Sequence, residues 1–397
     1  MVSLKAILPL IFIIAILIFE ERVSIPSCKT ISRNGVNEEG GVGFDSEGDL
    51  RVMLVADMLL MGSEASYMSL YFRDAYLTKF FKKSFERLKP DMLVVLGDVS
   101  AKGSKLTNSK WLSVLQQFQK ILGPWIALPF HIGLGDRDIG ECNKLNEKYV
   151  NWICSKLPGL DSTGCSSFEV SNISFVSINA VAMLCENNDL HFSVEKFIER
   201  ESFDLRSYSK DAKKRKNEPE DLGEINTNFG WRENTVSSGS GPVLLLHFPL
   251  HQTTSNNCEG STVLKRALNS SPRENSDNRR VSGAGPYKLL HTVPPNVSEY
   301  IFQALKPRII FSAHTHEFCD HTHMDGTREV TVPAMTWDAR DDPGFVFATF
   351  GRSRTVTVSQ CSLVRESHVI MFYISFFVIL TFTMLIANRS ELISSRR

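Results

Sequence analysis

Five short apolar runs along the chain each lead into an aspartate or a histidine. Runs of this kind, almost without polar interruption, are typical of strands buried on both faces of a sheet. Amphipathic stretches with helical spacing lie between the first three runs, at residues 71–88 and 111–121. This alternation predicts an α/β sheet with helical crossovers. The five expected strands are 51–56, 91–96, 125–132, 243–246 and 308–311.

The polar residues at the ends of these runs form one chemical set. Open α/β sheets place their functional sites beyond the carboxyl ends of the strands, so we expect these side chains to meet. A single aspartate at a strand end more often closes a turn, but a succession of six metal-binding side chains is difficult to explain by chance. Carboxylates and imidazoles together suit manganese, iron or zinc, and a bridging aspartate can hold two ions roughly 3.5–4 Å apart. The candidate ligands are Asp57, Asp98, Asp136, His247, His314 and His316.

The rest of the chain carries weaker strand signals and two long polar stretches. Residues 207–240 and 252–285 are polar and charged, and we expect them to be flexible insertions. Further strands are expected at 168–170, 173–178, 329–332, 345–350 and 355–360, with a helix at 296–305.

The composition limits the size of the domain and the kinds of partner that the protein can bind. The chain has 397 residues, of which 43% are hydrophobic, enough for one large domain or two small ones. Its 44 basic residues balance its 44 acidic residues. The zero net charge gives no electrostatic case for a nucleic-acid partner, and the sequence carries no clear oligomer signal.

Two uncharged apolar segments indicate a membrane protein. Residues 369–387 contain no charge over 19 positions and predict a transmembrane helix. Residues 6–19 form a shorter run after Lys5, which suits either the core of a signal peptide or a signal anchor. Charged residues follow this run in place of a small-x-small cleavage site, so an uncleaved anchor over residues 1–22 is favoured.

Charges outside the apolar segments predict the orientation of the chain. The tail, residues 388–397, carries three arginines, and positive charge stays in the cytosol. Lys5 argues the same for the N-terminus. The body is therefore expected to be lumenal or extracellular, with residues 23–50 as a polar spacer from the membrane. Glycosylation sequons fall in that body at Asn172, Asn269 and Asn296.

All eight cysteines also lie between the two apolar segments. An oxidising compartment permits disulfides there. Cys142, Cys154 and Cys165 lie close enough in sequence to predict a local bridge, and the remaining connectivity stays open.

The motifs at the strand ends resemble those of the calcineurin-like metallophosphoesterase superfamily. Its pattern is D-x-H, then G-D, then G-N-H-D/E, then H, then G-H-x-H. The resemblance covers about residues 50–360 and implies an α/β fold, a metallophosphoesterase-type β-sandwich flanked by helices. That domain is expected over residues 51–362, between one N-terminal and one C-terminal membrane segment. The matching stretches are Asp57-Met-Leu59, Gly97-Asp98, Gly135-Asp-Arg-Asp138, His247 and Ala313-His-Thr-His316.

More narrowly, residues 244–250 and 311–319 look like the eukaryotic membrane-anchored branch of that superfamily. This branch removes ethanolamine phosphate from the glycan of glycosylphosphatidylinositol anchors in the early secretory pathway. The resemblance therefore implies a metal-dependent phosphodiesterase in the endoplasmic reticulum or Golgi membrane. Its catalytic domain would be lumenal, both termini cytosolic, and its partners anchored proteins or the glycolipid itself.

The resemblance also implies which residues bind metal. Two divalent ions would be bound, manganese by preference, with iron or zinc as alternatives. The first ion would be held by Asp57, Asp98 and His316. The second would be held by Asp98, which bridges the two, and by Asp136, His247 and His314.

The chain departs from the family pattern at three positions that carry ligand or catalytic side chains. Leu59 replaces the histidine of D-x-H, so one imidazole is missing from the first metal site. Asp136 replaces an asparagine and still offers an oxygen. Arg137 replaces a histidine that acts on the leaving group in the family, and we interpret it as the catalytic group that stabilises charge on phosphate oxygens. Other candidates for the proton donor are His251, His321 and His323.

Leu59 and Arg137 also leave a second hypothesis open. The chain would then be a catalytically weak or inactive relative that binds a phosphoglycan or an anchored cargo protein. Retention of the other ligand positions favours the enzyme.

Overall fold

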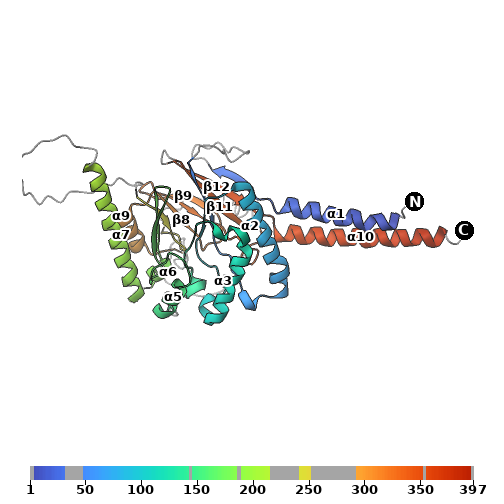
Figure 1. Ribbon diagram of the computed structural model, residues 1–397, viewed down its shortest axis with the longest axis horizontal. Coiled ribbons are helices and arrows are strands. Elements are labelled where there is room, and N and C mark those ends of the chain that lie inside the picture. The colour runs from blue at the N-terminus through green and yellow to red at the C-terminus, as the bar shows by residue number, and fades with distance from the viewer. Residues whose placement is uncertain are drawn as a thin grey trace, which may run out of the picture.

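Two six-stranded mixed sheets form the body of the molecule (Figure 1). The computed structural model describes residues 4–31, 48–142, 145–185, 189–214, 241–251, 292–351 and 355–394. The first sheet has the order β1-β12-β11-β2-β3-β4. Its strands are β1 (Ser27–Ile31), β2 (Leu50–Val55), β3 (Met92–Val95), β4 (Phe130–Ile132), β11 (Gly344–Phe350) and β12 (Val356–Ser362).

The second sheet has the order β5-β6-β7-β8-β10-β9. In the first sheet β2, β3 and β4 run parallel, and β11, β12 and β1 continue the sheet in antiparallel pairs. In the second sheet β6, β7, β8 and β10 run parallel between the antiparallel edge strands β5 and β9. The strands of the second sheet are β5 (Ser166–Val170), β6 (Ile173–Ser177), β7 (Val243–Leu245), β8 (Ile309–Ser312), β9 (Cys319–Thr322) and β10 (Arg328–Thr331).

The two sheets pack face to face, which confirms the expected sandwich. Phe350 of the first sheet contacts Phe175 and Phe311 of the second, with ring centroids 5.8 and 6.5 Å apart. Alternate residues of each strand face opposite ways, so Val52 points into this inner layer while Met53 points outward. The strands are apolar on both faces because each sheet is covered on both sides.

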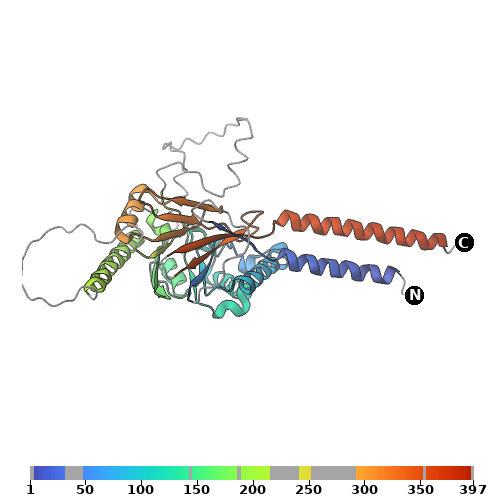
Figure 2. The same cartoon turned by 90° about the horizontal axis from the view of Figure 1, so that it is seen from above.

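Helices cover the outer faces of the sandwich (Figures 1 and 2). Over the first sheet lie α2 (Asp74–Leu88) and α3 (Asn108–Leu122), and over the second lie α7 (Asp189–Lys214) and α9 (Pro295–Leu305). Shorter helices connect the strands: α4 (Asp136–Ile139), α5 (Glu147–Cys154) and α6 (Ala180–Met183).

Three expectations about the chain need correction. Residues 125–127 belong to a 3₁₀ helix, Gly123–Ala127, rather than to a strand, because Pro124 favours a helical start and lacks the N–H that a ladder requires. Residues 27–31, inside the expected spacer, form the edge strand β1. Residues 207–214, inside the first expected insertion, belong to α7. The rest of that insertion and the second insertion lie outside the described residues.

The disulfides join distant parts of the chain. Cys28 on β1 bonds to its cross-strand partner Cys361 on β12, and Cys142 bonds to Cys185. The local bridge predicted among Cys142, Cys154 and Cys165 is therefore wrong. Cys154 and Cys165 are free thiols packed in the core with the apolar residues around them.

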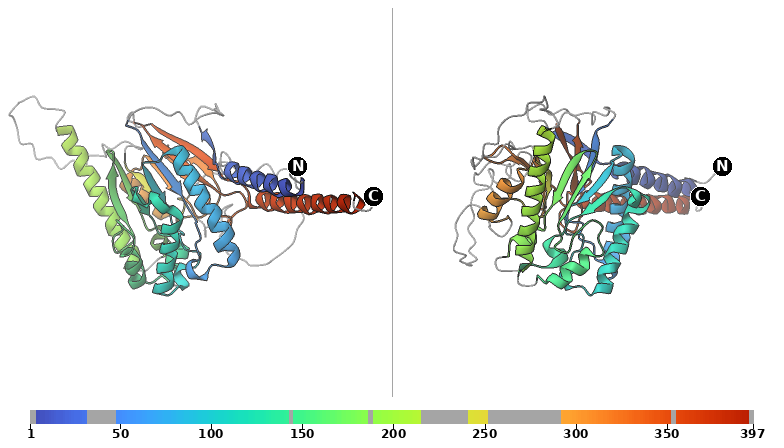
Figure 3. Two further views of the ribbon diagram at one scale, coloured as in Figure 1. Left: turned by 45° about the vertical axis from the view of Figure 1, so that its right-hand side comes forward. Right: turned by 60° about the vertical axis from the view of Figure 1, so that its left-hand side comes forward.

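Two long helices leave the same end of the body and lie side by side (Figures 1 and 3). They are α1 (Leu4–Val23) and α10 (Glu366–Ser394), and Phe19 of one stacks on Phe372 of the other. Among the described residues, the segment Glu366–Ile386 of α10 is the one that is long and apolar enough to cross a membrane. It coincides with the transmembrane helix expected at 369–387.

Helix α2 attaches both long helices to the body. Lys79 and Lys83 form ion pairs with Glu20 and Glu21 at the end of α1. Arg73, directly before α2, pairs with Glu366 at the start of α10 at 2.8 Å. Both long helices are therefore fixed to α2 or to the residue directly before it.

Candidate metal centre

All six predicted ligands lie at the carboxyl ends of the parallel strands. Because neighbouring parallel strands end at the same edge, residues far apart in sequence are brought together there. They follow their strands in this order: Asp57 after β2, Asp98 after β3, Asp136 after β4, His247 after β7, and His314 and His316 after β8.

One group of side chains surrounds Asp136. Its Oδ1 lies 3.2 Å from Nε2 of His247 and 3.1 Å from Nδ1 of His314. Burial would raise the pKa of Asp136, but hydrogen bonds from the two imidazoles hold it far below its usual range. The three side chains have the separation and chemistry of a metal-binding group.

A second group contains Asp57, Asp98 and again His247. Nε2 of His247 lies 3.6 Å from Oδ2 of Asp98, and Nδ1 of His316 lies 3.2 Å from Oδ2 of Asp57. Since His247 belongs to both groups, the two groups form one continuous cluster. Of the six residues, none lies apart from the others.

The polar atoms of Asp57 and His316 indicate that the cluster suits a cation. Asp57 is fully buried, and within the described chain neither of its carboxylate oxygens accepts a hydrogen bond. Nδ1 of His316 has no hydrogen-bond partner there either. A buried carboxylate in this state costs several kcal/mol unless a positive charge compensates it. A divalent cation fits this donor set.

His247 is oriented by the backbone. Its Nδ1 donates a hydrogen bond to the carbonyl of Leu96 at 2.8 Å, which directs Nε2 toward the carboxylates. Metal-binding histidines are commonly held in this way. Burial lowers the pKa of His247, but the neighbouring Asp98 and Asp136 carboxylates raise it to about 10. The carboxylates thus favour a positive charge at Nε2.

The backbone at the site is strained. Asp57, Asp98, His314 and His316 have φ values of 51°, 52°, 65° and 61°. Residues other than glycine rarely adopt this left-handed backbone conformation, because it costs of order 1–3 kcal/mol per residue. Residues in this conformation cluster at functional sites. Leu59 shares it, with φ of 52°.

Two glycines of the motifs are required by close packing. A Cβ on Gly135 would lie 2.1 Å from Oδ1 of Asp98, and one on Gly97 would lie 2.8 Å from Nδ1 of His247. Asp138 then fastens the two loops together, since it accepts hydrogen bonds from the N–H groups of Gly135 and Ser100 at 3.1 and 2.8 Å. Sequence reasoning gave Asp138 no role, and its place in the motif was the available signal.

Arg137, the predicted catalytic residue, lies beside Asp98. Its N–H donates to Oδ1 of Asp98 at 3.0 Å, and its Nε lies 3.4 Å from Oδ2. The side chain is 40% exposed and lines a pocket with Asp136 and two lysines that the sequence did not single out, Lys102 and Lys105. This pocket presents three cations and the carboxylates of Asp136 and Glu141 next to the candidate ligands, an excess of positive charge that suits a phosphate ester.

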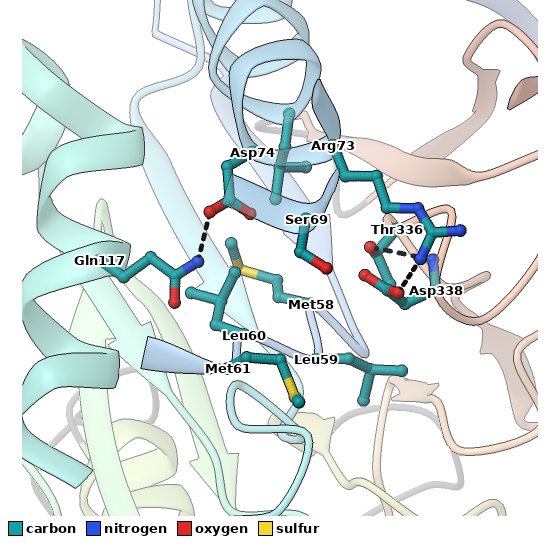
Figure 4. A pocket seen from close by; sticks show the side chains of 11 residues that line it. Met58, Leu59, Leu60, Met61, Ser69, Arg73, Asp74, Gln117, Thr336 and Asp338 are labelled. Carbon is teal, nitrogen blue, oxygen red and sulfur yellow. Dashed lines mark hydrogen bonds and ion pairs between the residues drawn. The ribbon is translucent and has the colours of Figure 1, made fainter. Parts of the chain in front are cut away.

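Leu59 is a buried side chain with both apolar and polar neighbours. It is only 4% exposed and lines a small pocket with Met58 and Met61 (Figure 4). Figure 4 shows Arg73 and Asp338 in the wall of the same pocket. The position that carries an imidazole in the family pattern is therefore filled by packed hydrocarbon.

The three histidines considered as alternative proton donors are held by residues other than the six candidate ligands. His321 and His323 both contact Glu329, at 3.5 and 2.6 Å. The backbone N–H of His251 donates to Ser298.

The sequence from residue 50 to residue 318 matches the model of the calcineurin-like phosphoesterase family. The chain belongs to this family, and with its cluster of candidate metal ligands it is a metallophosphoesterase, a hydrolase of phosphoric esters.

Curated relatives over most of the chain carry the name Metallophosphoesterase 1. The Xenopus laevis protein is 28% identical over 85% of this chain and 78% of its own length. The Rattus norvegicus protein is 25% identical over 83% of this chain and 76% of its own. Among solved structures, a dimetal phosphatase from Danio rerio aligns with 79% of this chain and 99% of its own, at 12% identity and a TM-score of 0.41. That structural likeness is too low to bear on function.

Proposed function

We propose that the protein is a membrane-bound, two-metal phosphodiesterase that removes ethanolamine phosphate from the glycan of glycosylphosphatidylinositol anchors. The observation that carries the two-metal chemistry is the buried Asp57 carboxylate without hydrogen bonds, opposite His316. The similarity to Metallophosphoesterase 1 proteins and the apolar helix α10 support a substrate held at a membrane.

In this proposal the six residues divide between two sites. Asp57, Asp98 and His316 would hold the first ion. Asp136, His247 and His314, again with Asp98, would hold the second. Bound divalent ions supply a hydroxide nucleophile at neutral pH and offset the negative charge of the phosphoryl group. Manganese is the metal that we favour, with iron or zinc as alternatives.

The side chains around the metals orient the substrate. Arg137 is tied to Asp98 through its backbone and Nε, so its remaining guanidinium donors face the pocket and can hold the phosphoryl oxygens. Lys102 and Lys105 add positive charge on the same wall and attract an anionic phosphoglycan. Arginine stays protonated, so Arg137 stabilises charge and does not supply the leaving-group proton.

The membrane arrangement follows from the same proposal. Helices α1 and α10 both cross the membrane, both termini are cytosolic, and the sandwich faces the lumen of the endoplasmic reticulum or Golgi. The contacts between Phe19 and Phe372, and between Phe12 and Phe376, support two helices in one bilayer.

The test is release of ethanolamine phosphate from a glycosylphosphatidylinositol substrate by the purified full-length protein in detergent with manganese. We expect release by the wild type, loss of at least 1000-fold in Asp98→Ala, and no change in Asp204→Ala, an exposed aspartate on α7. Chelation of divalent metals should abolish release, and manganese should restore it.

The same assay decides the alternative of an inactive relative, which the leucine at position 59, in place of the family's histidine, favours. Metal-dependent retention of the substrate without release would support that alternative. Release that persists in Asp98→Ala would contradict the proposed centre.

A further inference from the structure

A second cluster of metal-binding side chains lies on β9 and β10, away from the six residues of the candidate centre. It consists of His321, His323 and Glu329, and we call it the β9–β10 cluster. Nε2 of His321 lies 3.3 Å from Nε2 of His323 and 3.5 Å from Oε2 of Glu329. Nε2 of His323 lies 2.6 Å from the same oxygen. The three ligand atoms thus all lie within 3.5 Å of one another.

The strand pairing produces this arrangement. Glu329 on β10 is the direct cross-strand partner of His321 on β9. Cβ atoms of such partners lie about 5 Å apart on one face of the sheet. His323 follows two residues after His321 and so projects toward the same face. The turn beyond it is closed by the N–H of His323, which donates to the carbonyl of Thr327 at 2.9 Å.

The separations agree with a tetrahedral zinc ion. Zinc–ligand distances of 2.0–2.1 Å place neighbouring ligand atoms roughly 3.3 Å apart. Two of the three separations, 3.3 and 3.5 Å, match this value. The third, between His323 and Glu329, is the length of a hydrogen bond and would open by less than about 1 Å. Two histidines and one glutamate are an established zinc donor set.

The charge and the burial of these side chains also favour a bound cation. Glu329 is fully buried and His321 is 8% exposed. A buried carboxylate requires hydrogen bonds or a compensating positive charge, and one oxygen of Glu329 has both imidazoles within 3.5 Å. Two protonated imidazoles with nitrogens 3.3 Å apart would repel each other, whereas one cation can accept both nitrogen lone pairs and the carboxylate oxygen.

We propose that His321, His323 and Glu329 bind a zinc ion that is distinct from the metals of the candidate centre and has a structural role. The other oxygen of Glu329 accepts the backbone N–H of Leu250 at 3.2 Å. Leu250 lies three residues after His247, so a metal that fixes Glu329 also fixes the loop that carries this ligand. The described residues supply three ligands, which leaves one position of a tetrahedral ion.

The test measures zinc bound to the full-length protein in detergent after chelation and retitration. Two variants each remove one ligand and keep a side chain of similar shape: Glu329→Gln and His323→Gln. The matched control is His191→Gln, because His191 pairs with Glu195 at 3.2 Å and, among the described residues, belongs to no group of three metal-binding side chains. We expect each of the first two variants to bind one zinc fewer per chain at low zinc, with affinity at this site reduced at least 100-fold, and the control to bind as the wild type.

Two further measurements separate this site from the candidate centre and from misfolding. The same one-ion difference should appear in an Asp98→Ala background, where activity plays no part. Zinc should raise the thermal midpoint of Asp98→Ala more than that of Asp98→Ala/Glu329→Gln, although the zinc-free midpoints agree. Equal zinc content and equal zinc-induced shifts in the variants and their parents would overturn the proposal and leave the cluster an ordinary buried ion pair.

Discussion

At the scale of single residues, Leu59 and His316 determine how the first proposed ion is held. Leu59 contributes packed hydrocarbon where the family pattern has an imidazole, and it does so with the same left-handed backbone as Asp57 and Asp98. His316 is then the only imidazole assigned to that ion. The second ion keeps two, from His247 and His314.

This asymmetry predicts unequal effects of two matched substitutions. His316→Ala removes the single imidazole of the first site, so we expect metal content to fall by about one ion per chain and affinity there to fall more than 100-fold. His314→Ala leaves His247 on the second ion and should weaken binding by a smaller factor. Metal analysis of both variants over a manganese titration measures the difference, and equal losses would contradict the division of ligands.

The residues of the candidate centre could be predicted because each follows a recognisable apolar run. The residues of the β9–β10 cluster could not be grouped in this way. His321 and His323 are visible as a pair, but Glu329 lies on another strand, and the register that pairs it with His321 is set by tertiary structure. Lys102 and Lys105 were missed because exposed lysines carry no pattern of their own.

At the scale of elements, strand β4 contains a buried histidine, which its sequence does not predict. It is three residues long, and its middle residue, His131, is buried against Phe168 with ring centroids 4.9 Å apart. Nε2 of His131 has no hydrogen-bond partner in the described part of the chain. Burial lowers the pKa of His131 to about 4, so the ring is neutral in the folded protein.

The lowered pKa predicts a loss of stability in mild acid. The unfolded chain binds a proton at His131 below about pH 6.5, while the folded chain does so only near pH 4, so protons favour unfolding between these values. From pH 7.5 to pH 5 this residue should reduce the free energy of unfolding by about 2 kcal/mol. Urea unfolding of wild type and His131→Phe at both pH values measures it. The loss should be smaller in the variant, and identical losses would exclude His131 as the cause.

The elements that sequence reasoning found and missed differ in composition. The core strands β2, β3, β7 and β8 are nearly continuous apolar runs, and they were located to within about two residues. The edge strands β1 and β9, with sequences SCKTI and CDHT, were missed. Edge strands need little apolar surface, so their pairing with β12 and β10 depends on neighbours that only the fold supplies.

At the scale of the whole molecule, the two sequons of the body that lie within the described residues test the proposed orientation. Asn172 in the β5–β6 turn and Asn296 at the start of α9 are both exposed. If the body is lumenal, each should carry a glycan in eukaryotic cells. Asn172→Gln and Asn296→Gln should each increase gel mobility by one glycan, and glycosidase should remove the difference. Mobility that is unaffected by both substitutions and by glycosidase would place the body on the cytosolic side.

The disulfide between Cys28 and Cys361 has a consequence for substrate choice under this orientation. It joins the strand after α1 to the strand before α10, while α2 is bound to both helices by ion pairs. A domain on a single flexible stalk samples many heights above a bilayer, but one fastened at both ends keeps one height and one tilt. Such an enzyme selects phosphodiesters by their distance from the lipid surface, so the length of the glycan, as well as its chemistry, decides which substrates reach the metals.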